Sequence, residues 1–88
     1  MVINVHVPFE GAIAGTDLTI AFDQIRRDVA KLPTDLQSPI AIYCRSGRMS
    51  AVAARTLAEL GYTNVVELEG GMNSWVAAGR VLVDDPAG

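Results

Sequence analysis

The stretch IAIYCRSGRMSAVAARTL, residues 40–57, decides the fold of this chain. It opens with a short apolar run, Ile40 to Tyr43, which is typical of a strand buried on both faces of a parallel sheet. A glycine-containing loop follows, and from Ser50 to Leu60 the apolar residues recur at the spacing of an amphipathic helix. A strand, a loop and a helix in this order predict one unit of an α/β fold, with Cys44 at the carboxyl end of its strand.

The flanking segments predict further elements of the same kind. Alternating apolar and polar residues near the amino terminus indicate a strand, and an i, i+4, i+7 pattern that stops before Pro33 indicates a helix. Gly61 suits a left-handed helix cap, and Gly70-Gly71 suits a tight turn. The tail from Val81 is expected to be mostly irregular. The predicted flanking elements are strands at Val2–Val7, Leu18–Ala21 and Asn64–Leu68, and helices at Asp23–Leu32 and Met72–Ala78.

Strands that alternate with helices predict α/β architecture with a mainly parallel central sheet. The length of 88 residues suffices for one small domain, so a single domain is expected over residues 1–88. In open sheets of this kind ligands bind at the carboxyl ends of the strands, which is where Cys44 lies.

Composition excludes several classes of function. The formal net charge is −3 and the seven Lys and Arg residues are scattered, so no nucleic-acid partner is expected. A single cysteine excludes an intrachain disulfide and a multi-cysteine zinc site. No window reaches the ~18 apolar residues of a membrane span, so no membrane partner is expected. The amino terminus lacks the pattern of a secretory signal, which favours a cytoplasmic location unless an export signal has been removed.

Two interpretations of Cys44 are open from the residues around it. A lone cysteine at the end of a buried strand can be a small apolar core residue without chemistry. Alternatively, converging loop amides and the positive end of a helix dipole would form an anion-binding nest around its sulfur and lower the thiol pKa. Arginines at positions 45 and 48 would strengthen that effect. A loop rich in Arg, Ser and Gly is a poor wall for an apolar core, which favours the reactive thiolate.

Residues 40–79 resemble the carboxyl-terminal half of a rhodanese domain, a family of persulfide-forming sulfurtransferases. The resemblance rests on the strand, Cys44 loop and helix, on the helix end at Gly-Tyr, on the following VVELEGG segment, and on the helix that carries Trp75. It implies a rhodanese-like three-layer fold. Met72 and Trp75 are expected to pack beneath the Gly70-Gly71 turn.

The amino-terminal part, VINVHVPFEGAIAGTDLTIAF, resembles the family more loosely. Asn4 stands where the family usually has Asp, His6 where Arg is frequent, and Thr16-Asp17 where His-Ile is common. The usual first strand and helix of the family are also missing ahead of Val2. These departures concern residues that brace the loop. His6 is expected to be a surface or structurally satisfied histidine rather than a catalytic base.

The resemblance implies a thiosulfate sulfurtransferase that acts by a ping-pong mechanism. The Cys44 thiolate would take sulfur from a small anionic donor such as thiosulfate and pass it, as a persulfide, to a thiol or cyanide, without metal or cofactor. Phosphatases of related type use Cys-x5-Arg, and Ser50 occupies that closing position here, so the loop is expected to be the sulfurtransferase version. The substrate-binding residues implied are Arg45, Ser46, Gly47, Arg48, Met49 and Ser50.

Two alternatives from other classes remain. One is a sulfur-carrier or regulatory binding module with the same fold and a persulfidable Cys44 but no turnover of its own. The other is a folded, inert domain, which the absent first elements and the residues at positions 4 and 6 would explain. An exposed sheet edge favours self-association, so a monomer or a weak homodimer is expected.

Overall fold

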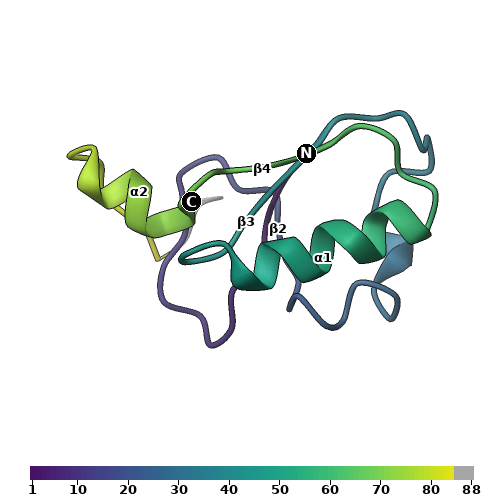
Figure 1. The fold of residues 1–88 in the computed structure, drawn as a ribbon. Coiled ribbons are helices and arrows are strands. Elements are labelled where there is room, and N and C mark those ends of the chain that lie inside the picture. The colour runs from purple at the N-terminus through teal and green to yellow at the C-terminus, as the bar shows by residue number, and fades with distance from the viewer. Residues whose placement is uncertain (85–88) are drawn as a thin grey trace.

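The computed structural model describes residues 1–84, which form a four-stranded parallel sheet in the order β2-β1-β3-β4 (Figure 1). Strand β3 lies inside the sheet, and its Ile40, Ile42 and Tyr43 are buried, as expected for an apolar run covered on both faces. Because β3 is a central strand, Cys44, the next residue, lies at the carboxyl end of the sheet between the ends of β1 and β4. The strands are β1 (Val2–Asn4), β2 (Leu18–Thr19), β3 (Ile40–Tyr43) and β4 (Val65–Glu67).

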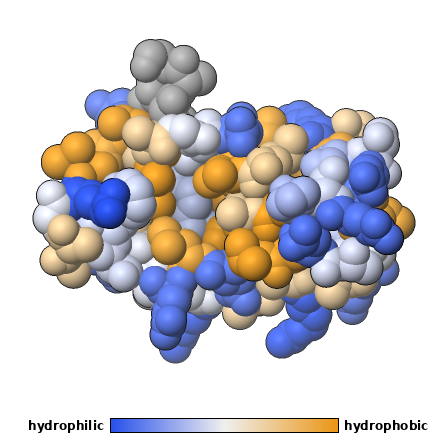
Figure 2. All heavy atoms as spheres, turned by 90° about the horizontal axis from the view of Figure 1, so that it is seen from above, coloured by the Kyte–Doolittle hydropathy of each residue, from blue (hydrophilic) through white to orange (hydrophobic). Residues whose placement is uncertain are grey.

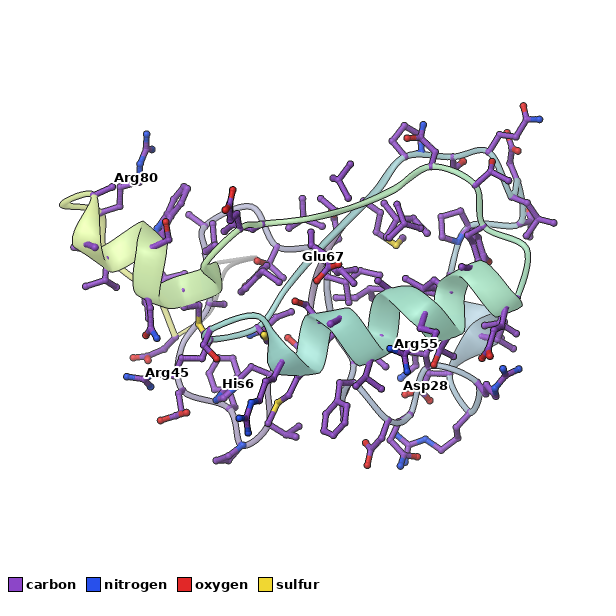
Figure 3. The ribbon with its side chains drawn as sticks, viewed as in Figure 1. His6, Asp28, Arg45, Arg55, Glu67 and Arg80 are labelled. Atoms are coloured by element: carbon purple, nitrogen blue, oxygen red, sulfur yellow. The ribbon has the colours of Figure 1, made fainter. Side chains whose placement is uncertain are left out.

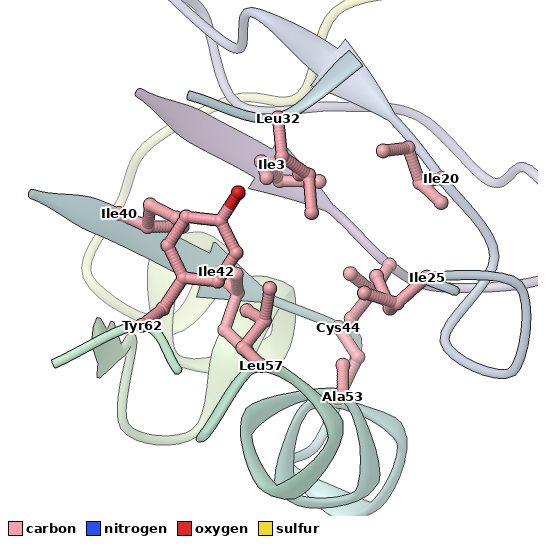
Figure 4. Close-up of a cluster of buried hydrophobic side chains, with 11 residues drawn as sticks. Ile3, Ile20, Ile25, Leu32, Ile40, Ile42, Cys44, Ala53, Leu57 and Tyr62 are labelled. Atoms are coloured by element: carbon pink, nitrogen blue, oxygen red, sulfur yellow. The ribbon is translucent and has the colours of Figure 1, made fainter. Parts of the chain in front are cut away.

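One face of the sheet is covered by helix α1 (Arg48–Glu59). Ala53 and Leu57 of α1 are fully buried against Ile3 and Ile42 of the sheet, and Cys44 belongs to the same apolar cluster (Figure 4). No helix within residues 1–84 has the length and apolar character needed to cross a bilayer.

A second, smaller apolar cluster lies on the opposite face of the sheet. Tyr43 is its central residue, and Met72 and Trp75 of helix α2 (Gly71–Ala77) pack there. Figure 2 shows this face, with apolar atoms gathered over its middle. Val66 of β4 remains 59% exposed, so the second layer covers the sheet only in part. The two clusters confirm the expected α/β fold with a parallel sheet between apolar layers.

The predicted helix over Asp23–Leu32 is wrong. The segment forms successive turns, with one turn of 3₁₀ helix, η1 (Val29–Lys31). Ile25 and Leu32 are buried, whereas Val29, the middle residue of the apolar pattern, is 43% exposed. Only Ile25 and Leu32 reach the core. A short helix without a packed apolar face is marginal in water, so the segment forms turns that bury these two side chains instead.

Other boundaries differ by a few residues from the predicted ones. The first strand ends at Asn4 rather than Val7, because the amide of His6 bonds to the Asn4 side chain instead of a neighbouring strand. The tail is irregular as predicted, apart from one antiparallel bridge between Val83 and Ala12, and the residues from 85 onward lie outside the described part. Strand β2, strand β4, helix α1 and helix α2 begin or end one to two residues from the predicted positions.

Leu57→Ala is expected to destabilise the protein by about 2–5 kcal/mol, because it leaves a cavity beneath the sheet. Leu57 has no exposed surface, whereas the matched residue Val66 is 59% exposed, so Val66→Ala is expected to cost far less. Urea unfolding followed by circular dichroism measures both. Equal losses for the two variants would contradict this account of the core.

Candidate active site

The Cys44 sulfur lies where β3 ends and α1 is about to begin. Cys44 is only 2% exposed. The loop turns back at Gly47, whose φ of 129° is open to glycine but strained for other residues. This turn brings the Gly47 amide to 3.0 Å from the sulfur of Cys44, so the amide donates a hydrogen bond to it.

Ser50, in the first turn of α1, also contacts the sulfur. Its hydroxyl oxygen is 3.6 Å from Cys44 Sγ and 3.1 Å from the carbonyl oxygen of Gly47. It is also 2.9 Å from Oε1 of Glu67, the last residue of β4. The sulfur therefore has both a backbone amide and a buried hydroxyl as neighbours.

These contacts lower the pKa of the Cys44 thiol below its ordinary value. Burial acts in the opposite direction and raises it, but the Ser50 hydroxyl and the amides of Ser50, Gly47 and Ser46 together outweigh burial by hydrogen bonding to the sulfur. The amino end of α1 points its dipole at the same place, which also favours a thiolate.

Alkylation of Cys44 by iodoacetamide is expected to reach half its maximal rate at a lower pH in the folded protein than in the unfolded chain. The thiolate is the species that reacts, and its fraction rises as pH increases through the thiol pKa. A lowered pKa therefore shifts the whole rate profile toward acid. The same protein in urea is the control, and superimposable profiles would contradict the anion nest.

A pocket of about 220 Å³ opens over the sulfur. Its wall is built by the Cys44 loop together with side chains from the segment after β1 and from α2. Within residues 1–84 no three His, Cys, Asp or Glu side chains gather as a metal site would require. The pocket is lined by His6, Cys44, Arg45, Ser46, Arg48, Met49 and Asn73.

Two arginines of the loop differ in their partners. Arg45 donates to Oε2 of Glu10 at 2.9 Å, and Glu10 also hydrogen-bonds to the His6 ring (Figure 3 labels His6 and Arg45). The bond from His6 lowers the pKa of Glu10, burial opposes this, and the charge of Arg45 lowers it further. Arg48 lines the same pocket, and no carboxylate among residues 1–84 pairs with it. Of the two guanidinium groups, that of Arg48 is therefore the one without a carboxylate partner among residues 1–84.

Asn4 and His6, where the sequence departs from the expected pattern, make bracing contacts of their own. The buried amide of Asn4 donates to the carbonyl of Gly11 at 3.1 Å and accepts from the His6 amide at 3.0 Å. A carboxylate could not donate the first of these bonds. The loop between β1 and Gly11 is therefore held by the asparagine.

Helix α2 is fixed directly to the Cys44 loop. The amide of Met72 donates to the Cys44 carbonyl at 2.8 Å, and the amide of Asn73 donates to the Arg45 carbonyl at 3.0 Å. Gly71, with φ of 56°, makes this close approach possible, because a Cβ there would lie 2.2 Å from the Cys44 carbonyl oxygen. The Gly70-Gly71 turn thus serves backbone geometry, as the sequence suggested.

The structure brings together all the residues expected at the site, in two kinds of position. Arg45, Ser46, Arg48 and Met49 line the pocket. Gly47 and Ser50 contact the sulfur of Cys44 from within the loop and helix instead. The Met49 sulfur also accepts the Val7 amide at 3.5 Å and the side chain packs on the core, so it contributes to folding as well. The roles of these residues in binding stay predictions.

Three residues at the site were not anticipated from the sequence: His6 and Asn73 in the pocket wall, and Glu67 on Ser50. His6 follows β1 and Glu67 ends β4, on the side of the sheet where Cys44 lies, whereas Asn73 lies in helix α2. For His6 and Glu67 the available signal was the rule that the carboxyl ends of parallel strands meet at one edge of the sheet.

The comparisons with known proteins agree with this geometry. The family model described as Rhodanese-like domain matches residues 3–78. The adenylyltransferase and sulfurtransferase UBA4 of Meyerozyma guilliermondii is 31% identical over 71 residues, which are 81% of this chain and 15% of that protein. The chain thus spans about 15% of the length of this curated relative.

Solved structures give the same result. A rhodanese-related protein of Thermoplasma volcanium matches with a TM-score of 0.79 and 34% identity, over 96% of this chain and 83% of that one. A thiosulfate sulfurtransferase of Pseudomonas aeruginosa matches with a TM-score of 0.80 and 27% identity, over 96% of this chain and 16% of that one. With the family model matched from residue 3 to residue 78, the chain belongs to the rhodanese-like domain family.

Proposed function

We propose that this domain is a sulfurtransferase that moves sulfane sulfur from a small anionic donor such as thiosulfate to a thiol or cyanide, through a persulfide on Cys44. The observation that carries the proposal is the position of the sulfur, which lines an open pocket and accepts the Gly47 amide at 3.0 Å. The sulfurtransferase names of UBA4 and of the Pseudomonas protein support the same class of reaction.

The chemistry divides into two displacements at sulfur. The Cys44 thiolate attacks the outer sulfur of thiosulfate, the sulfur–sulfur bond of the donor breaks, and sulfite leaves with the bonding electron pair. A thiolate or cyanide then attacks the outer sulfur of the persulfide, and the bonding pair returns to Cys44 as a thiolate. The amide donors of the loop, which are in place before reaction, stabilise Cys44 both as the attacking thiolate of the first displacement and as the leaving thiolate of the second.

The pocket suits a small anion. Its volume of about 220 Å³ leaves room for a few heavy atoms above the sulfur, and two guanidinium groups lie in its wall. Glu10 neutralises Arg45, whereas Arg48 has no carboxylate partner among the described residues. Arg48 is therefore proposed as the group that orients the donor over Cys44.

Arg48→Ala is expected to lower kcat/KM for thiosulfate by about 10- to 100-fold, the range of a lost charge-assisted hydrogen bond to a bound anion. Arg48 is exposed and begins α1, so folding should be nearly unchanged. Arg55→Ala, at an exposed position of the same helix, is the matched control. Initial rates over a range of thiosulfate concentrations measure the effect, and equal kcat/KM values for both variants would contradict the assignment.

The test of the proposed function is thiocyanate formation by the purified protein from thiosulfate and cyanide. Sustained turnover, many thiocyanate molecules for each protein molecule, supports an enzyme. One thiocyanate per protein and no more would indicate a sulfur carrier that depends on a partner. No thiocyanate from a folded protein, with no sulfur on Cys44, would overturn the proposal.

A further inference from the structure

Glu67 reaches the reactive sulfur through a single intervening hydroxyl. In the register of β3 and β4, Glu67 lies beside Ile42, so its side chain leaves the sheet on the face that α1 covers. Figure 3 shows it between β4 and α1. There its Oε1 is 2.9 Å from the hydroxyl of Ser50, a residue only 1% exposed, and that hydroxyl is 3.6 Å from Cys44 Sγ.

The Ser50 hydroxyl has one hydrogen and three neighbours that can accept it. These are Oε1 of Glu67 at 2.9 Å, the carbonyl oxygen of Gly47 at 3.1 Å, and the sulfur of Cys44 at 3.6 Å. A carboxylate is the strongest acceptor of the three while Cys44 is a neutral thiol, and it is also the nearest. The hydrogen then points to Glu67, and the Ser50 oxygen presents a lone pair to the thiol.

We propose that Glu67 is a positioning residue that holds the Ser50 hydroxyl hydrogen away from the Cys44 sulfur until that sulfur carries a negative charge. When Cys44 ionises, the hydroxyl must leave Glu67 to donate to the sulfur, so the carboxylate and the thiolate compete for one hydrogen. The fixed donor, the Gly47 amide, has no such alternative partner.

The competition has a direction. An ionised Glu67 favours the neutral thiol, so its removal stabilises the thiolate. A glutamine at position 67 would keep the shape and could donate its own amide hydrogen to the Ser50 oxygen, which leaves the hydroxyl hydrogen free for the sulfur. The other titratable groups near the sulfur are unchanged by this substitution: His6, Arg45 and Arg48 in the pocket wall, and Glu10, which bonds to Arg45 and His6.

The experiment measures the pH dependence of Cys44 alkylation in the wild type and in Glu67→Gln, with Glu69→Gln as the matched control. Glu69 is an exposed carboxylate two residues further along and makes no side-chain hydrogen bond to residues 1–84. Glu67→Gln is expected to lower the thiol pKa by about one unit, the size of one hydrogen bond to a charged group. Glu69→Gln is expected to leave it in place. Equal profiles for wild type and Glu67→Gln would overturn the proposal.

A second pair of variants separates the hydrogen bond from simple charge repulsion. In a Ser50→Ala background the hydroxyl that links Glu67 to Cys44 is absent, so adding Glu67→Gln is expected to produce no further shift of the thiol pKa. An undiminished shift in that background would show that Glu67 acts by charge through space and would overturn the proposal. If Ser50→Ala does not fold, the comparison of Glu67→Gln with Glu69→Gln still decides, since equal shifts in those two refute a role of the Ser50 contact.

The alkylation readout requires no sulfur donor or acceptor. The proposal concerns the same sulfur as the proposed function but rests on the Glu67, Ser50 and Cys44 contacts alone. A protein that forms no thiocyanate can therefore still show the pKa shift, and the two failures are distinguishable.

Discussion

Cys44→Ser is expected to abolish thiocyanate formation from thiosulfate and cyanide, with a loss of about 10⁴-fold or more. A serine hydroxyl is not ionised near neutral pH, and it cannot form the persulfide that carries sulfur between the two half-reactions. The hydrogen bonds that stabilise the Cys44 thiolate cannot make up for this loss. Initial rates at saturating thiosulfate measure the effect.

The serine variant also reports on the fold, since Cys44 is almost completely buried. The Gly47 amide and the Ser50 hydroxyl that surround the sulfur can bond to a serine oxygen as well, so only a small change in unfolding free energy is expected. Turnover within tenfold of wild type in a folded Cys44→Ser protein would exclude Cys44 as the nucleophile.

Gly71→Ala is expected to destabilise the protein by about 3 kcal/mol or more, the range of severe backbone and packing defects. An added Cβ would lie 2.2 Å from the carbonyl oxygen of Cys44 and 2.8 Å from that of Arg45, and neither backbone atom can rotate away. Helix α2 would have to leave the loop, which breaks the bonds from Met72 and Asn73 to those carbonyls. Urea unfolding measures the loss.

Gly79→Ala is the control that separates steric contact from backbone strain. Gly79 also has a positive φ, 86°, but no atom lies within 4 Å of a Cβ built there. Only the strain of a left-handed alanine is expected, about 1–2 kcal/mol. Equal losses at the two glycines would contradict the close approach of α2 to the Cys44 loop.

The part of the fold that sequence patterns predicted well is the part with the strongest local signals. Residues 40–43 are apolar throughout because both faces of β3 are covered, and the twelve residues of α1 combine helical periodicity with high alanine content. The segment before Pro33 shows the limit. Its apolar spacing matched a helix, but Val29 is exposed and packs against no apolar side chains of the core that residues 1–84 form. The segment therefore forms a series of turns that bury only Ile25 and Leu32.

The candidate site was predictable in its loop and not in its surroundings. Cys44 and the residues up to Ser50 are contiguous, so a local motif in the sequence is enough to predict that they lie together. His6, Asn73 and Glu67 reach the site from other strands and helices, and their contacts depend on the register of the sheet. Glu67 faces Ser50 only because β4 pairs with β3 in the observed register, since a slip of one residue would turn it to the opposite face.

The intact mass of the reduced protein before and after incubation with thiosulfate tests the central claim most directly. The account predicts that the wild type gains the mass of one sulfur atom, that cyanide removes it, and that Cys44→Ser gains nothing. A folded wild-type protein that gains no sulfur, or a Cys44→Ser protein that gains one, would contradict a persulfide on Cys44.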